Sequence, residues 1–123
     1  MAASPFVIIV GPCASGKTTL MQGLTALGHN ARSIAQEHSY VPYFWSLKRP
    51  DLLVMLDAEI ETVRRRRAVS YGQERIDAQR RQLAHARQHC NLYLPTDDLT
   101  IDQVRERVIE LIERWKEAHH AAS

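Results

Sequence analysis

The chain has 123 residues, 45% of them hydrophobic, and a formal net charge of +2. This composition excludes a disordered, collagen-like or disulfide-stabilised chain, and the length fits one core, which predicts a single domain over residues 1–123. No apolar run approaches the roughly 20 residues of a membrane span, the N-terminus lacks the positive charge of a signal peptide, and two cysteines suit a reducing compartment, so we expect a cytoplasmic protein with no membrane contact.

Apolar β-branched runs alternate with stretches of helical spacing along the chain. In chain order we expect a strand at 6–10, a helix at 17–27, a weaker strand at 31–36, a loop or single helical turn at 38–50, a strand at 52–56, helices at 59–69 and 74–89, a strand at 91–94 and a final helix after Thr100. Such alternation predicts an α/β fold. We expect a short, mostly parallel sheet of about four strands, with 6–10 central and helices on both faces.

The start of the final helix has a sequence signature of its own. Thr100 and Gln103 fit a capping box, with the threonine at the N-cap and the glutamine three residues later. The apolar residues that follow recur at helical spacing, which predicts one buried face. They are Ile101, Val104, Val108, Leu111, Ile112 and Trp115.

A glycine-rich motif lies between the first strand and the first helix. Residues 11–18 (GPCASGKT) match the pattern G-x-x-x-x-G-K-[ST], in which backbone N–H groups surround phosphate oxygens at a helix N-terminus. In this pattern Lys17 reaches the β- and γ-phosphates and the Thr18 hydroxyl binds Mg²⁺. A glycine-rich turn without a ligand needs neither residue, so we expect nucleotide binding. The expected contacts are Gly11, Pro12, Cys13, Ala14, Ser15, Gly16, Lys17, Thr18 and Thr19.

With this motif in place, the sequence resembles the P-loop NTPases, and within them the small nucleoside, adenylate and shikimate kinase-like branch. The resemblance continues through 52–57 (LLVMLD) and the arginine helix after it, through 83–87 with Tyr93, and through 94–100 (LPTDDLT). It implies ATP or ADP with Mg²⁺ as the ligand, Pro95 and Thr96 beside adenine, and Arg64 or Arg67 against adenine or a phosphate. It also implies an arginine that faces the transferred phosphoryl group.

The sequence departs from this branch in the stretch 28–51, which is too short for the usual acceptor-binding insertion and further strand. It holds no D-x-D or G-G-G acceptor motif. We therefore expect a pared-down member of the family whose small-molecule acceptor is unidentified.

Two acidic residues are candidates for the metal and the chemistry. Glu37 follows the strand expected at 31–36, and Asp57 ends the strand at 52–56. We favour Glu37 as the residue that serves Mg²⁺ or orients an acceptor, because the resemblance places Asp57 one strand away. Asp57 alternatively caps the helix that starts near Glu59.

Arginine is concentrated in one segment of the chain. Residues 64–90 hold eight arginines against Glu74 and Asp77, which predicts a polyanion site and an arginine-rich lid around 70–73. Closure of that lid would bring Arg75, Arg80 or Arg87 onto the phosphates, and we name Lys17, Glu37, Arg75 and Arg87 as catalytic candidates. For any single arginine, the simpler explanation is a solvated helix face.

Two further clusters allow several interpretations. The aromatic residues at 40–45 line an acceptor pocket, cover the sheet edge, or form a contact between copies of the chain. His85, His89 and Cys90 have metal-ligand spacing, but no further ligand pair is visible, so we do not predict zinc there. Cys13 either fits the loop by its small size or has a thiol pKa lowered by the helix N-terminus.

These observations lead to three functional hypotheses. The first is a kinase that transfers the ATP γ-phosphoryl group to an unidentified small acceptor. The alternative is an ATPase or nucleotide-binding regulatory module. Nucleic-acid binding ranks last, because no aromatic stacking platform accompanies the arginines. The absence of an N-K-x-D motif favours adenine over guanine.

Overall fold

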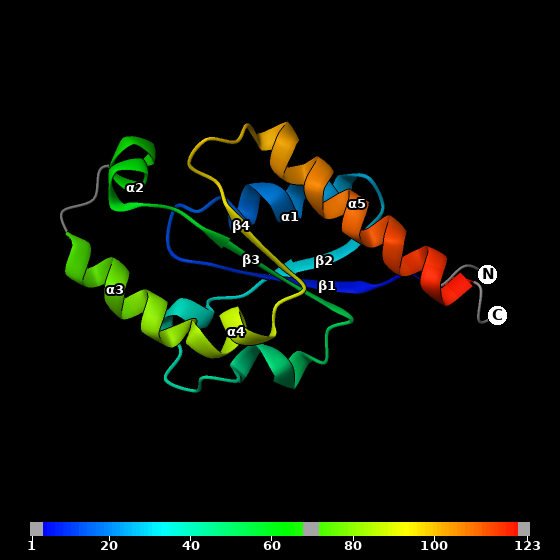
Figure 1. The fold of residues 1–123 in the computed structure, drawn as a ribbon, viewed down its shortest axis with the longest axis horizontal. Helices are drawn as coiled ribbons and strands as arrows, with labels where there is room; N and C mark the ends of the chain where they lie inside the picture. Colours follow the sequence, from blue (N-terminus) through cyan, green and yellow to red (C-terminus); the bar gives the residue numbers. More distant parts are fainter. Residues whose placement is uncertain (1–3, 68–71, 121–123) are drawn as a thin grey trace.

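A parallel β-sheet organises the chain in the computed structural model, which describes residues 4–67 and 72–120. Its strands are β1 (Phe6–Val10), β2 (Asn30–Ser33), β3 (Leu52–Asp57) and β4 (Leu92–Pro95), in the order β2-β1-β3-β4 (Figure 1). All three strand pairs are parallel. The prediction of an α/β fold with a four-stranded parallel sheet is confirmed, with β1 inside the sheet.

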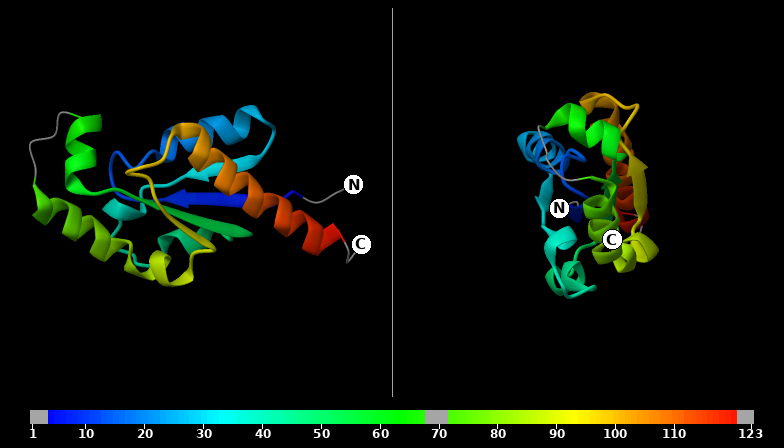
Figure 2. Two further views of the ribbon diagram at one scale, coloured as in Figure 1. Left: turned by 45° about the horizontal axis from the view of Figure 1, so that its top comes forward. Right: turned by 90° about the vertical axis from the view of Figure 1, so that its left-hand side faces the viewer.

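Helices cover both faces of this sheet, as expected. In Figure 1, α1 (Lys17–Ala26) and α5 (Ile101–His120) lie on one side, and α3 (Gln73–Gln82) and α4 (Ala84–His89) lie on the other. The arrow of β1 points toward the end of the molecule that holds α2 (Ile60–Arg66), as the left panel of Figure 2 shows. The loop after β1 therefore opens at that end.

Alternation along the strands explains the two layers, because successive strand side chains point to opposite faces. In β1, Val7 and Ile9 face the first core cluster, which α1 and α5 cover, while Ile8 and Val10 face the second, which Leu83 and Ala86 cover. All four β1 residues named are fully buried. The central strands read as continuous apolar runs for this reason.

The predicted element bounds hold less well away from the sheet. The helix expected at 74–89 is interrupted at Leu83, which is fully buried and whose N–H contacts the carbonyls of both Gln79 and Arg80. After this interruption, the side chains of Leu83 and Ala86 pack in the second core cluster. Helix α2 ends at Arg66, and positions 68–69 of the helix expected at 59–69 lie outside the described residues.

The strand expected at 31–36 is shorter, because the chain leaves the sheet after Ser33. Two 3₁₀ turns follow, η1 (Gln36–His38) and η2 (Phe44–Lys48). The side-chain amide of the fully buried Gln36 donates to Val41 O and Gln82 O and accepts from the Trp45 N–H, which ties η1 to η2 and α3. Glu37 thus lies in η1, beyond the strand.

The capping box at the start of α5 is confirmed. The Thr100 N–H donates to Gln103 Oε1 at 2.9 Å, and the Gln103 N–H donates to Thr100 Oγ1 at 3.1 Å. The buried face of α5 then contributes Val104, Val108 and Ile112 to the first core cluster, and Leu111 and Trp115 pack against it. The expectation that Ile101 belongs to this face is wrong, because its side chain is 63% exposed at the start of the helix. Among the described helices, none combines the length and apolarity that crossing a bilayer requires.

Candidate functional site

The glycine-rich loop, residues 11–18, follows β1 and opens α1 as the sequence pattern predicts. A Cβ on Gly11 would lie 2.5 Å from Leu56 O and 2.7 Å from Ser15 Oγ, so only glycine fits there. Gly16 has φ of 102° and forms the N-cap of α1 without a side-chain cap. Within the described ranges, the N–H groups of Gly16, Lys17, Thr18 and Thr19 donate no hydrogen bond, which leaves them available to an anion.

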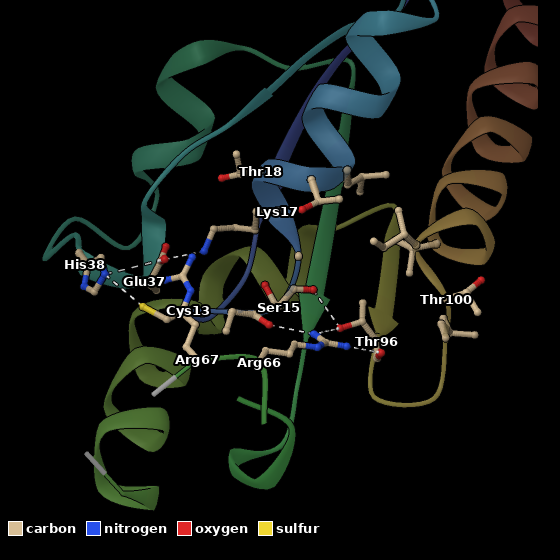
Figure 3. A pocket seen from close by; sticks show the side chains of 17 residues that line it. Cys13, Ser15, Lys17, Thr18, Glu37, His38, Arg66, Arg67, Thr96 and Thr100 are labelled. Atoms are coloured by element: carbon tan, nitrogen blue, oxygen red, sulfur yellow. Dashed lines mark hydrogen bonds and ion pairs between the residues drawn. The ribbon is translucent and has the colours of Figure 1, made fainter. Parts of the chain in front are cut away.

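A cavity of about 670 Å³ lies beside this loop (Figure 3). The loop and the start of α1 form one wall, and η1, the end of α2 and the segment from Thr96 to Val104 form the others. Ten predicted site residues meet here: Cys13, Ala14, Ser15, Gly16, Lys17, Thr18, Thr19, Glu37, Arg67 and Thr96.

Lys17 and Glu37 form an ion pair inside this cavity. Lys17 Nζ lies 2.5 Å from Glu37 Oε2 and donates to Gly11 O at 2.6 Å, and the two side chains are 13% and 4% exposed. The register of the sheet explains the pair, because β2 and β1 are neighbours and their carboxyl ends meet at one edge. Two of the four catalytic candidates, Lys17 and Glu37, are thus in direct contact.

Two buried side-chain oxygens near the loop have no hydrogen-bond partner among the described residues. They are Ser15 Oγ and Glu37 Oε1. Ser15 is 1% exposed and Glu37 is 5% exposed, and both line the cavity. Because a buried polar atom without a partner costs roughly 1–3 kcal/mol, each of these oxygens has a free hydrogen-bonding position that a water or a polar ligand in the cavity can fill.

An arginine that the sequence analysis did not select joins α2 to the loop. Arg66 donates to Ala14 O at 2.8 Å, to Thr96 Oγ1 at 3.0 Å and to Thr96 O at 2.7 Å. The buried Thr96 hydroxyl also lies 2.9 Å from Ser15 O. These contacts connect the loop, α2 and the end of β4 on one side of the cavity, as Figure 3 shows.

Asp57 is placed differently from Glu37, because it does not line the cavity. Its carboxylate accepts from the Ala58 N–H, from Arg80 at 3.2 Å and from the Tyr93 hydroxyl at 2.5 Å. Burial and the bond to Asp57 raise the pKa of Tyr93 to about 12. For Arg80, burial lowers the pKa, but the charge and hydrogen bond of Asp57 outweigh this and raise it.

The alternative role of Asp57 as a helix cap is wrong. The N-cap of α2 is Glu59 and has no side-chain cap hydrogen bond. Instead, Asp97 Oδ1 accepts from the Glu59 N–H at 2.8 Å and from the Thr62 hydroxyl at 2.5 Å. Burial opposes ionisation of Asp97, but these hydrogen bonds outweigh it and lower the pKa of that carboxyl. Asp97 is closer to the helix end because β4 carries it alongside β3.

The remaining predicted residues lie away from the cavity lining. Gly11 and Pro12 lie beneath Lys17, which contacts their carbonyls. Arg87 lies 3.8 Å over the Tyr93 ring, and Arg75 is exposed on α3. Arg64 and Pro95 are also exposed. Of the expected lid at 70–73, Ser70 and Tyr71 lie outside the described residues.

The aromatic residues at 40–45 do not line this cavity. Trp45 packs against the second core cluster, and its indole N–H donates to His85 Nδ1 at 3.1 Å. Tyr40 and Tyr43 are 90% and 52% exposed. Trp45 therefore covers part of one face of the sheet, not its edge. None of these aromatic residues lines the cavity, so the expectation of an acceptor pocket there gains no support.

Besides Arg66, two further polar residues that the sequence did not identify contact the loop. Gln79, 3% exposed on α3, accepts from the Cys13 N–H at 2.9 Å and lies 3.4 Å from Cys13 Sγ. His38 lies beside Cys13, with its Nε2 3.6 Å from the sulfur. A signal for Gln79 existed, because it occupies the helical apolar stripe with Ile76 and Leu83. No such signal marks His38.

Comparison with models of known protein families gives no match for this sequence. A search of curated proteins also finds no significant relative.

Proposed function

We propose that the cavity binds ATP with its phosphates in the glycine-rich loop, and that the chain is a pared-down member of the P-loop NTPase superfamily with kinase-like activity. The observation that carries the proposal is the cavity wall itself. It combines the backbone N–H groups of residues 16–19, which donate no hydrogen bond within the described ranges, with the Ser15 hydroxyl and the Lys17 ammonium. This is an arrangement of donors and positive charge that suits a polyphosphate.

The other side of the cavity suits a flat base. Leu99, Ile101 and Val104 line it, and Ile101 is 63% exposed. Burial of these side chains against a purine ring would remove apolar surface from water. We propose that adenine lies here, with Arg67 from the end of α2 at the phosphates or the base.

The donor chemistry near the loop also fits Mg²⁺, which prefers oxygen ligands. Thr18 offers a hydroxyl and Glu37 a buried carboxylate with one unpartnered oxygen. When bound, the ion would neutralise charge on the β- and γ-phosphate oxygens. Asp57, the other metal candidate, already has three partners for its carboxylate, so we propose Glu37 for this role.

In the proposed reaction, Lys17 exchanges Glu37 for the phosphates and stabilises their negative charge. An acceptor hydroxyl attacks the γ-phosphorus while the bond to the ADP oxygen breaks, and Glu37 accepts the hydroxyl proton or orients the acceptor. The loop N–H groups hold the phosphates in line, so the chain contributes positioning and electrostatic stabilisation. The acceptor would share a cavity of about 670 Å³ with the nucleotide, which favours a small molecule.

The second candidate, an ATPase or nucleotide-binding regulatory module, is favoured by the contact between α3 and the loop. Gln79 holds the Cys13 N–H, a group that phosphates contact in the proposed complex. A phosphate that takes this N–H would release Gln79 and so change the packing of α3. Such a coupling would give a conformational readout without any acceptor.

The proposal is tested first by thermal unfolding with ATP, ADP, AMP and GTP, each with and without Mg²⁺. Ligand that binds only the folded state raises the unfolding midpoint according to its concentration and Kd. We expect ATP and ADP to raise it in the wild type and in Lys48→Ala, whose lysine lies in η2 and outside the cavity. No shift with any nucleotide would contradict the proposal.

The loss-of-binding variant must keep the buried charges balanced. Lys17→Ala alone leaves Glu37 unpaired in a buried place, which by itself costs stability. The double variant Lys17→Met/Glu37→Gln removes both charges together, and we expect it to lose the nucleotide-induced shift. A shift as large as in the wild type would remove Lys17 from the proposed site.

Turnover separates the two candidate functions. A kinase hydrolyses ATP slowly alone and forms ADP faster when the correct acceptor is added. An ATPase uses water efficiently and is not accelerated by any acceptor. ADP formation with and without a panel of small hydroxyl and nucleotide acceptors distinguishes them, with the double variant as the background.

A further inference from the structure

Three metal-ligand side chains meet at the η1 side of the loop. Cys13 Sγ lies 3.6 Å from His38 Nε2, and His38 Nε2 lies 3.9 Å from Glu37 Oε2. One ligand atom from each of the three residues lies within 4.8 Å of the others. They come from two segments, the loop after β1 and η1 after β2, which adjacent strands hold together (Figure 3).

The Cys13–His38 separation matches a tetrahedral zinc site. Zn²⁺ binds sulfur at about 2.3 Å and nitrogen or oxygen at about 2.0–2.2 Å, so two of its ligands lie about 3.3–3.8 Å apart. The His38–Glu37 separation of 3.9 Å is about 0.1 Å beyond that range, so the exposed His38 ring needs to move only slightly toward Glu37. The set of thiolate, imidazole and carboxylate contains a soft ligand, which favours zinc over magnesium. Three protein ligands would leave a fourth position toward the cavity, as in open zinc sites.

The surroundings of the three residues support a site with an entry path. The His38 side chain is 56% exposed and so can adjust from solvent, whereas the Glu37 side chain is 4% exposed and fixed. Gln79 Nε2 lies 3.4 Å from Cys13 Sγ and can donate to a metal-bound sulfur. Glu37 Oε1, buried and without a partner, is a further acceptor at the same place.

We propose that Cys13, Glu37 and His38 bind Zn²⁺. Binding replaces the thiol proton of Cys13 with the metal, and the proton passes to solvent. It also takes the Glu37 carboxylate from Lys17, whose Nζ lies 2.5 Å from Oε2. Zinc and the Lys17 ammonium therefore compete for one carboxylate. The site needs no nucleotide, so zinc binding is tested separately from the proposed function, although both proposals use Glu37, and zinc bound there would take the place of Mg²⁺ at this carboxylate.

The test is a zinc titration of tag-free protein against a chromogenic chelator, with no nucleotide present. Binding of Co²⁺ provides a second readout, because a thiolate ligand gives a cobalt charge-transfer band that water and carboxylates do not. We expect equimolar, saturable binding in the wild type. Cys13→Ser and His38→Ala should each weaken it at least about tenfold, and Cys13→Ser should abolish the charge-transfer band.

The matched control is Cys90→Ser/His89→Ala, which removes the chain's other neighbouring cysteine and histidine. It should bind zinc as the wild type does. Loss of binding in this control, or retained binding and charge transfer in Cys13→Ser, would overturn the proposal. So would the absence of saturable binding in the wild type. His38 is exposed, so His38→Ala tests the site even if a change inside the loop impairs folding.

The competition between zinc and Lys17 for Glu37 gives a second test. A purely structural effect of Lys17 on the loop would not make zinc bind more tightly when Lys17 is removed. Lys17→Ala frees the Glu37 carboxylate from its ion pair, so we expect zinc to bind this variant several-fold more tightly than the wild type. An unchanged or weaker affinity would remove Glu37 from the ligand set and overturn the proposed three-residue site.

Discussion

At the scale of single residues, Gly11 makes the sharpest prediction. Its Cβ position lies 2.5 Å from Leu56 O, a backbone atom of the inner strand β3, which sheet pairing on both sides holds in place. We expect Gly11→Ala to lower the free energy of unfolding by about 1–3 kcal/mol, from overpacking and backbone strain. Urea denaturation measures the loss.

Gly28→Ala is the matched control for this steric argument. Gly28 also has a positive φ, 90°, but a Cβ there meets no atom within 4 Å. Only the backbone penalty of about 1 kcal/mol is expected. Equal losses in the two variants would contradict the claim that Leu56 O restricts position 11.

The side chain of Tyr93 predicts how the free energy of unfolding depends on pH in the alkaline range. Burial and its hydrogen bond to Asp57 raise the pKa of Tyr93 to about 12, whereas an unfolded tyrosine titrates near about 10. Above about pH 10 the unfolded chain releases this proton and the folded chain keeps it, so the stabilisation from Tyr93 is complete below pH 10 and is lost as the pH rises toward 12.

This prediction is measured as the difference in unfolding free energy between the wild type and Tyr93→Phe. At neutral pH we expect a difference of about 1–2 kcal/mol, because the variant removes a hydrogen bond to a buried carboxylate. The difference should shrink between about pH 10 and pH 12. Tyr43→Phe, at an exposed tyrosine, is the control. A constant difference across that range would argue against the raised pKa.

At the scale of elements, α1 contains a glycine that its geometry does not require. Gly23 lies inside the helix, and a Cβ there would meet Arg105 Cδ at 3.3 Å. Arg105 has a long, partly exposed side chain on α5 that can move away. We therefore expect Gly23→Ala to stabilise the protein by about 0.5–1 kcal/mol, through helix propensity.

Thermal and urea unfolding measure this gain, and the Arg105→Ala background isolates the contact. The gain should be at least as large there, because the neighbour of the new methyl group is gone. Destabilisation by Gly23→Ala in both backgrounds would show that α1 needs the glycine for another reason.

The elements also show what local sequence can predict. The inner strands β1 and β3 follow from their continuous apolar runs, and α5 follows from its helical periodicity, because these patterns are local in the sequence. The break at Leu83, the shortened β2 and the contact of Gln79 with Cys13 depend on residues far apart in the chain. The same holds in the site: residues of the 11–18 motif are local, whereas Arg66 and His38 reach the cavity through packing of α2 and η1.

At the scale of the whole molecule, each face of the sheet carries one tryptophan. Trp115 on α5 packs against the first core cluster, and Trp45 in η2 packs against the second. The strands between them contribute alternate side chains to both clusters, so the two cores share the same backbone. We infer that the two layers unfold as one cooperative unit. This tests the prediction that residues 1–123 form a single domain.

The variants Trp45→Phe and Trp115→Phe each leave one tryptophan as the reporter of one face. We expect both fluorescence transitions in urea to coincide with the loss of far-ultraviolet circular dichroism. The decisive step adds Leu83→Ala, which deletes a fully buried side chain of the second cluster at a cost of about 2–5 kcal/mol. In the Trp45→Phe background the only reporter is Trp115, on the opposite face. If the sheet couples the layers, Leu83→Ala lowers the Trp115 midpoint as much as the circular dichroism midpoint; an unmoved Trp115 transition would mean that the face of α1 and α5 folds without the other.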